Sequence, residues 1–86
     1  MIITVRKPTE QERKEAAAWP VWKKGPSSFP WSYGEKETCL ILEGEVTVEA
    51  GGEKVSFGPG DYVVFPEGLA CTWHIRKAVR KHYRFG

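Results

Sequence analysis

The stretch GDYVVFPEGLAC, residues 60–71, decides the fold prediction, because it sets one short strand between two turn signals. Residues 58–61, Gly-Pro-Gly-Asp, have proline at the first central position of a turn and glycine at the second, which suits a type II turn. Residues 61–65 are rich in the aromatic and β-branched types that favour strands. Pro-Glu-Gly at residues 66–68 turns the chain again. The stretch therefore predicts a strand that enters and leaves through tight turns.

The same alternation of short strands and turns continues on both sides of this stretch. Residues 37–42 are apolar on both faces, which predicts a strand buried on both sides, and Gly44 is expected to end it. Gly51 and Gly52 form a two-residue hairpin turn, because both positions need positive φ. The other expected strands are residues 45–49, 53–57, 71–75 and 79–85. Many short strands at this spacing predict an all-β sandwich or barrel.

The N-terminal segment predicts one short helix. Residues 2–6 are expected to form a strand, and after it Thr9 and Glu12 have the spacing of a capping box, in which each side chain bonds the other residue's backbone N–H. The helix that they begin consists of good helix formers. Because most of its faces are polar, it is expected to pack through Ala17 and Trp19 only.

The chain is too short for more than one domain. With 86 residues, we predict a single domain over 1–86, with a core barrel at about 29–85 and the N-terminal strand and helix within 2–18. Residues 20–30 contain three prolines and one glycine and are predicted to form an ordered loop.

Composition excludes several classes of partner. The net charge is +2, and the five basic residues of segment 68–86, which has no acid, are interpreted as a solvated strand face, so no nucleic-acid partner is predicted. They are Arg76, Lys77, Arg80, Lys81 and Arg84. No apolar stretch approaches the ~20 residues of a membrane span, and the N-terminus does not look like a secretory signal. A cytoplasmic location is therefore expected, where Cys39 and Cys71 would stay reduced.

Two motifs, in the right order, resemble those of the cupins. The spacing of Gly60, Pro66, Gly68 and Cys71 resembles the second cupin motif, and Glu37 with the later Gly44 resembles the end of the first. The resemblance implies a cupin-type double-stranded β-helix, a jelly-roll barrel.

Longer stretches are similar to one group of small cupins. Residues 37–44, 60–73 and 79–83 look closest to the type-3 cupins grouped with the (S)-ureidoglycine aminohydrolase cupin domain. That enzyme is a two-cupin protein that uses manganese to release ammonia from ureidoglycine, so the resemblance implies an alternative function on a small nitrogenous substrate.

The resemblance also implies a metal site, of which only one ligand remains. Glu37 is kept, whereas Trp31 and Tyr33 stand where two histidines would be and Cys71 stands where the third would be. Tryptophan offers no lone pair, and manganese and iron prefer imidazole and carboxylate ligands. We therefore expect a degenerate metal site and no cofactor. Glu37 and Cys71 stay as weak metal candidates, because zinc accepts both ligand types.

A ligand cavity is the function that these positions favour. The cupin register points Trp31, Tyr33, Glu37 and Cys71 into the barrel mouth. Strand alternation adds Cys39 and Trp73 to the interior. Aromatic walls with one carboxylate suit a small cationic or amine-bearing molecule.

Other interpretations remain open at this stage. The rings can instead fill a barrel that is too small to stay hollow, with Glu37 bonded to Tyr33 or to backbone. In an enzyme, Glu37 would act as acid or base, assisted by Tyr33 or Cys71. Thiol chemistry at Cys71 is disfavoured, because a nearby carboxylate raises the pKa of a thiol. Alternation places His74 on the face opposite Cys71, and the face of His82 is open.

A homodimer is the expected assembly. Cupins commonly pair, and the apolar outer face of residues 37–42, together with strand 2–6, is expected to be covered by a second copy.

Overall fold

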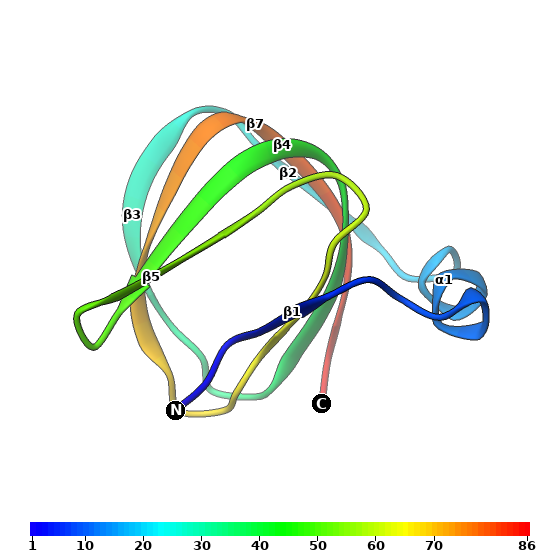
Figure 1. The fold of residues 1–86 in the computed structure, drawn as a ribbon, viewed down its shortest axis with the longest axis horizontal. Helices are drawn as coiled ribbons and strands as arrows, with labels where there is room; N and C mark the ends of the chain where they lie inside the picture. The colour runs from blue at the N-terminus through cyan, green and yellow to red at the C-terminus, as the bar shows by residue number, and fades with distance from the viewer.

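The computed structural model describes residues 1–86, which form seven strands and one helix. The elements are β1 (Thr4–Arg6), α1 (Glu10–Ala16), β2 (Val21–Lys24), β3 (Ser27–Ser32), β4 (Glu37–Ala50), β5 (Glu53–Phe57), β6 (Tyr62–Phe65) and β7 (Ala70–Phe85). The helix lies outside the barrel, and both chain termini lie at the same end of it (Figure 1). The helix is too short and too polar to cross a membrane.

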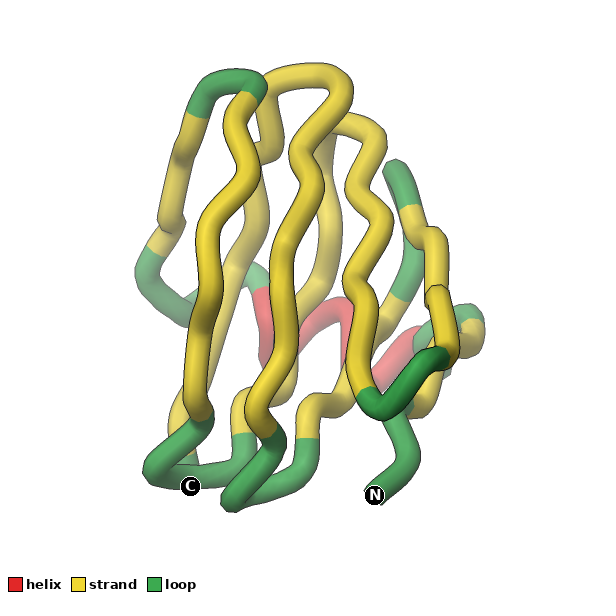
Figure 2. Tube along the Cα trace, turned by 90° about the vertical axis from the view of Figure 1, so that its left-hand side faces the viewer, coloured by secondary structure: helices red, strands yellow, loops and turns green.

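Two long strands organise the barrel. β4 and β7 pair antiparallel along most of their length, and each contributes to both layers. One layer has the order β1-β6-β4-β7-β2, while β5 joins β4 and β3 joins β7 in the other. Figure 2 shows the strands running side by side between loops at the two ends. The predicted all-β jelly-roll barrel with one short N-terminal helix is confirmed.

Gly44 bends a strand instead of ending it. Its φ is +112°, and the pairing of β4 with β7 shifts register between Ile41 and Val46. The chain crosses from one layer to the other at this point, so the two strands expected at 37–42 and 45–49 are one strand. Glycine tolerates positive φ, which lets a bulge turn the strand while the ladder continues.

The loop predicted for residues 20–30 is wrong, because β2 and β3 lie there. Both strands pair with β7 and have no strand on their other side. An edge strand needs only one row of hydrogen bonds, so Pro30 is tolerated within β3 although it has no N–H. The prolines of residues 20–30 are therefore compatible with edge strands and do not require a loop.

The helix is capped as predicted but packs through a different residue. The Glu12 N–H donates to Thr9 Oγ1 at 3.1 Å, and the Thr9 N–H donates to Glu12 Oε1 at 2.9 Å. Ala17 is exposed, whereas Ala16 is fully buried against Leu40 and Tyr62. The expected contact through Ala17 is therefore wrong by one position.

The outer face of the N-terminal half of β4 is covered by the chain's own helix. Ala16, Leu40 and Tyr62 form a small cluster outside the barrel, and Trp19 packs against it. This cover buries Leu40, which belongs to the apolar face from which a second copy was inferred. The oligomeric state itself stays a prediction.

The stability contributed by the capping glutamate should depend on pH. Glu12 also accepts two hydrogen bonds from Arg6, at 2.7 and 2.6 Å, and these bonds, followed by that from Thr9, lower the pKa of Glu12 from 4.5 to about 2. A lowered folded-state pKa means that the stabilisation is present above the unfolded value and is lost as the pH falls. Glu12→Gln should therefore lower the urea midpoint at neutral pH, and its difference from wild type should vanish between about pH 4.5 and 2.

The control for this prediction is Glu15→Gln on the same helix, which removes a carboxylate that makes no ion pair. A difference between Glu12→Gln and wild type that persists unchanged at low pH would show that the charge of Glu12 plays no part.

Candidate functional site

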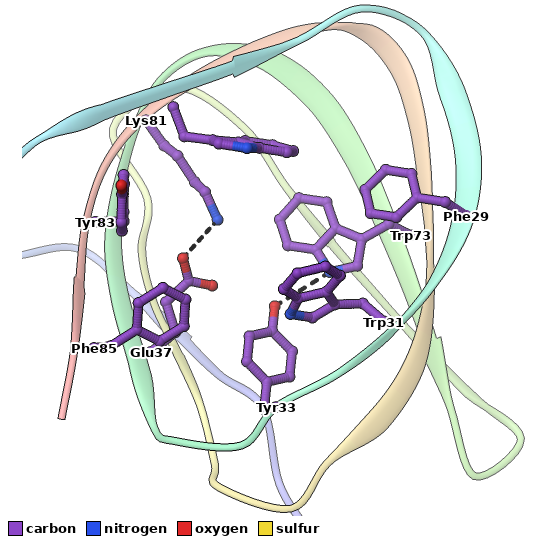
Figure 3. A pocket seen from close by; sticks show the side chains of 9 residues that line it. Phe29, Trp31, Tyr33, Glu37, Trp73, Lys81, Tyr83 and Phe85 are labelled. Carbon is purple, nitrogen blue, oxygen red and sulfur yellow. Dashed lines mark hydrogen bonds and ion pairs between the residues drawn. The ribbon is translucent and has the colours of Figure 1, made fainter.

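A cavity of about 200 Å³ lies inside the barrel. Strands β2, β3, β4 and β7, with the residues after β3, supply its walls, and Trp31 and Phe85, both close to half exposed, are its most exposed lining residues. Figure 3 shows the lining side chains converging on one space. They are Trp22, Phe29, Trp31, Tyr33, Glu37, Trp73, Lys81, Tyr83 and Phe85.

The charged groups of the cavity form one buried ion pair. Lys81 Nζ donates to Glu37 Oε2 at 2.8 Å, and the two side chains are only 5% and 4% exposed. Lys81 faces inward because it shares one face of β7 with the buried Val79 and the cavity-lining Tyr83. The interpretation of this strand's basic residues as a solvated face is therefore wrong for Lys81. Alternation along residues 79–83 carried the signal that would have identified it.

The rings of Trp22 and Trp73 both contact the ammonium group of Lys81. Lys81 Nζ lies 4.9 Å from the ring centroid of Trp22 and 4.7 Å from that of Trp73. Both distances are within the range of a cation–π interaction. The cation that the aromatic walls were expected to bind is thus supplied by the protein.

Tyr33 is a neutral donor in the cavity wall. Its ring stacks on Phe65 with centroids 4.9 Å apart, and its hydroxyl accepts a hydrogen bond from Trp73 Nε1 at 3.2 Å. Burial first, and then the charge of Glu37, raises the pKa of Tyr33, so the phenol keeps its proton. That O–H has no acceptor within the chain.

Four of the six predicted ligand-binding residues line the cavity and two do not. Trp31, Tyr33, Glu37 and Trp73 are brought together there, whereas Cys39 and Cys71 are not among the lining residues.

The two cysteines are buried, free thiols. Burial raises the pKa of Cys39 to about 12 and also raises that of Cys71, so both stay protonated at neutral pH. The Cys71 thiol faces the backbone oxygen of Trp31 at 3.6 Å. A protonated thiol is a poor nucleophile, which argues against thiol chemistry.

The donor atoms in the cavity do not fit a metal ion. One oxygen of Glu37 is bonded to Lys81, Trp31 offers no lone pair, and Tyr33 holds its proton. No three His, Cys, Asp or Glu side chains gather anywhere in the chain. A positive ammonium beside the one remaining ligand would repel a divalent cation.

Both histidines lie on outer faces. His74 hydrogen-bonds with Ser28 Oγ through Nδ1 at 2.9 Å and pairs with Glu49 through Nε2 at 2.8 Å, on the face that alternation predicted. His82 Nδ1 is 2.9 Å from the backbone oxygen of Trp19, in the loop after the helix. Neither ring is placed to act in the cavity.

The antiparallel jelly-roll with an inward cavity defines this protein as a cupin. The particular family is the EutQ-like cupin domain, to which residues 11–83 match and to which the chain belongs.

Three solved structures show how far the likeness extends. A DUF861 family protein from Thermotoga maritima is 43% identical, with 99% of this chain and 100% of that one covered and a TM-score of 0.94. The EutQ protein of Clostridium difficile is 20% identical, with 76% and 52% covered and a TM-score of 0.71. A putative ethanolamine utilization protein Q from Salmonella typhimurium is 24% identical, with 99% and 69% covered and a TM-score of 0.71. The last two likenesses show the fold alone. A search of the curated proteins finds no match.

Proposed function

We propose that this cupin binds a small molecule inside its barrel, without a native metal ion. The observation that carries the proposal is a buried ion pair with unused hydrogen-bonding capacity beside open space. Glu37 Oε2 is bonded to Lys81, but the second carboxylate oxygen has no partner within the chain. In Figure 3 the carboxylate and the ammonium both lie at the edge of the cavity. Arg80 Nε is the one fully buried side-chain polar atom without a partner, so the free Glu37 oxygen is accessible from the cavity, where a ligand can bond it.

The size of the cavity limits the ligand. A volume of about 200 Å³ is below the roughly 300–1,000 Å³ of drug-sized sites. The aromatic walls supply flat apolar surface, and the exposed Trp31 and Phe85 give the ligand a place to enter.

Small molecules that copurify with the protein test this function. Mass spectrometry of the denatured wild-type protein should detect a molecule released in near-stoichiometric amount. Glu37→Gln keeps the shape of the side chain and removes its charge, so it should release much less. The matched control is Glu45→Gln on the same strand, whose side chain is half exposed and outside the cavity, and which should release the wild-type amount. Equal release from all three proteins would contradict the proposal.

A second candidate function is an enzyme acting on a small nitrogenous substrate, as the motif resemblance to the ureidoglycine aminohydrolase cupins implies. The observation in its favour is that a carboxylate, a phenol and an ammonium face one cavity, from Glu37, Tyr33 and Lys81. Cys71 is outside the cavity lining, so Tyr33 would be the assisting group. Ammonia release from ureidoglycine that is lost in Glu37→Gln but kept in Glu45→Gln would support an enzyme, and no release by wild type would exclude that substrate.

A further inference from the structure

The polar groups of the cavity present both a hydrogen-bond acceptor and donors. The free oxygen of Glu37 accepts, whereas Lys81 keeps two N–H groups beyond the one given to Glu37, and Tyr33 keeps its O–H. These groups face the same space (Figure 3). A ligand that satisfies them must therefore accept and donate at neighbouring atoms.

The charges of the cavity cancel. Glu37 and Lys81 form a 2.8 Å pair, and no other charged side chain lines the cavity. A cationic ligand would lie beside the Lys81 ammonium, and an anionic ligand would lie beside the Glu37 carboxylate. Both arrangements place like charges close together where little water screens them, which is unfavourable.

Lys81 also occupies the position that a ligand cation would use. Its ammonium lies 4.9 Å from Trp22 and 4.7 Å from Trp73, and the carboxylate that would anchor a foreign cation is already bonded to it. Displacing the ammonium would bury it without a partner, at high free-energy cost. The protein's own side chain therefore competes with any cationic ligand.

We propose that the cavity selects an uncharged, flat molecule in which a carbonyl oxygen lies beside an N–H or O–H donor, and that Lys81 is the residue that excludes cations. The carbonyl oxygen accepts from Lys81 or Tyr33, the donor bonds the free oxygen of Glu37, and the flat body lies between the aromatic walls. This ligand class rests on the proposed binding function and replaces the cationic ligand expected from the sequence.

Three probes of one shape and different charge test the proposal. Benzamide is neutral and has a carbonyl oxygen beside an N–H, benzamidinium carries a positive charge, and benzoate carries a negative charge. Each is added to isotope-labelled wild-type protein, and binding is followed through the indole N–H signals of Trp22 and Trp73, which line the cavity. Benzamide should shift these signals with a dissociation constant at least about tenfold lower than those of the two ions.

The single variant Lys81→Met removes the ammonium, keeps apolar volume and leaves the Glu37 carboxylate free to pair with a ligand cation. It should bind benzamidinium more tightly than benzamide, because the ligand cation then takes the place of Lys81 beside Glu37, and benzamidinium should raise the urea midpoint of this variant. Trp19, which lies outside the barrel, gives an internal control, because its indole signal should not respond to any probe.

The outcomes separate the ligand class from the binding function. Equal or tighter binding of benzamidinium or benzoate by wild type overturns the ligand class but leaves small-molecule binding standing. Absence of any shift with all three probes also overturns the ligand class, and a copurified molecule would then still support binding. An unchanged preference for benzamide over benzamidinium in Lys81→Met overturns the role of Lys81.

Discussion

Glu37→Leu and Lys81→Met are each expected to lower the free energy of unfolding by about 3–5 kcal/mol, because each leaves one buried charge without its partner. The two side chains are only 4% and 5% exposed, so water replaces the lost partner only in part. The loss should be a large share of the total, since domains are stable by only about 5–15 kcal/mol. Urea unfolding at neutral pH, followed by circular dichroism, measures the effect.

The variant that lacks both charges separates the effect of losing the ion pair from the cost of leaving one charge buried alone. With both charges removed, Glu37→Leu/Lys81→Met should recover most of the lost stability, because a buried ion pair replaced by apolar side chains of similar volume is often neutral or stabilising. The coupling energy is the difference between the double variant and the sum of the two singles. If the two single losses simply add, the 2.8 Å contact is not an energetic pair.

Gly44→Ala is expected to destabilise the barrel by more than about 3 kcal/mol, from backbone strain and overpacking together. A Cβ atom at Gly44 would lie 2.7 Å from the Ala78 carbonyl oxygen and 2.8 Å from the Val79 Cα. Both neighbours are backbone atoms of β7, so neither can move without disturbing the β4–β7 ladder. The φ of +112° adds strain for any L side chain. The measurement is again the urea midpoint.

Two other glycines serve as controls for the two causes. Gly51 has a φ of +57° and open space around it, so Gly51→Ala should show the backbone strain alone, about 1–2 kcal/mol. Gly34 has neither positive φ nor a neighbour within 4 Å, and Gly34→Ala should stay within about 0.5 kcal/mol of wild type. If Gly44→Ala lowers the free energy of unfolding no more than Gly51→Ala does, the β7 backbone moves to accept the added Cβ atom at little cost.

The sequence by itself determined the class of fold and the face on which most residues lie. Turn residues such as Gly51 and Gly68 act through their own backbone angles, and both have positive φ in the structure. Alternation acts through the pleat of one strand, so it placed Trp73 inward and His74 outward, whereas the cupin resemblance placed Tyr33. These properties depend on neighbours in the chain, which is why they could be predicted.

The tertiary structure alone decided what stands opposite each of those residues. Glu37 and Lys81 are 44 positions apart, and only the pairing of β4 with β7 brings them together. Because the β4–β7 pairing continues on both sides of Gly44, this glycine lies at a bend within β4 and not at the end of a strand. Residues 20–30 form β2 and β3 because they can pair with β7. Strand register is set by the packing of the whole barrel and not by local preference. The ion pair that occupies the expected cation site therefore required the structure.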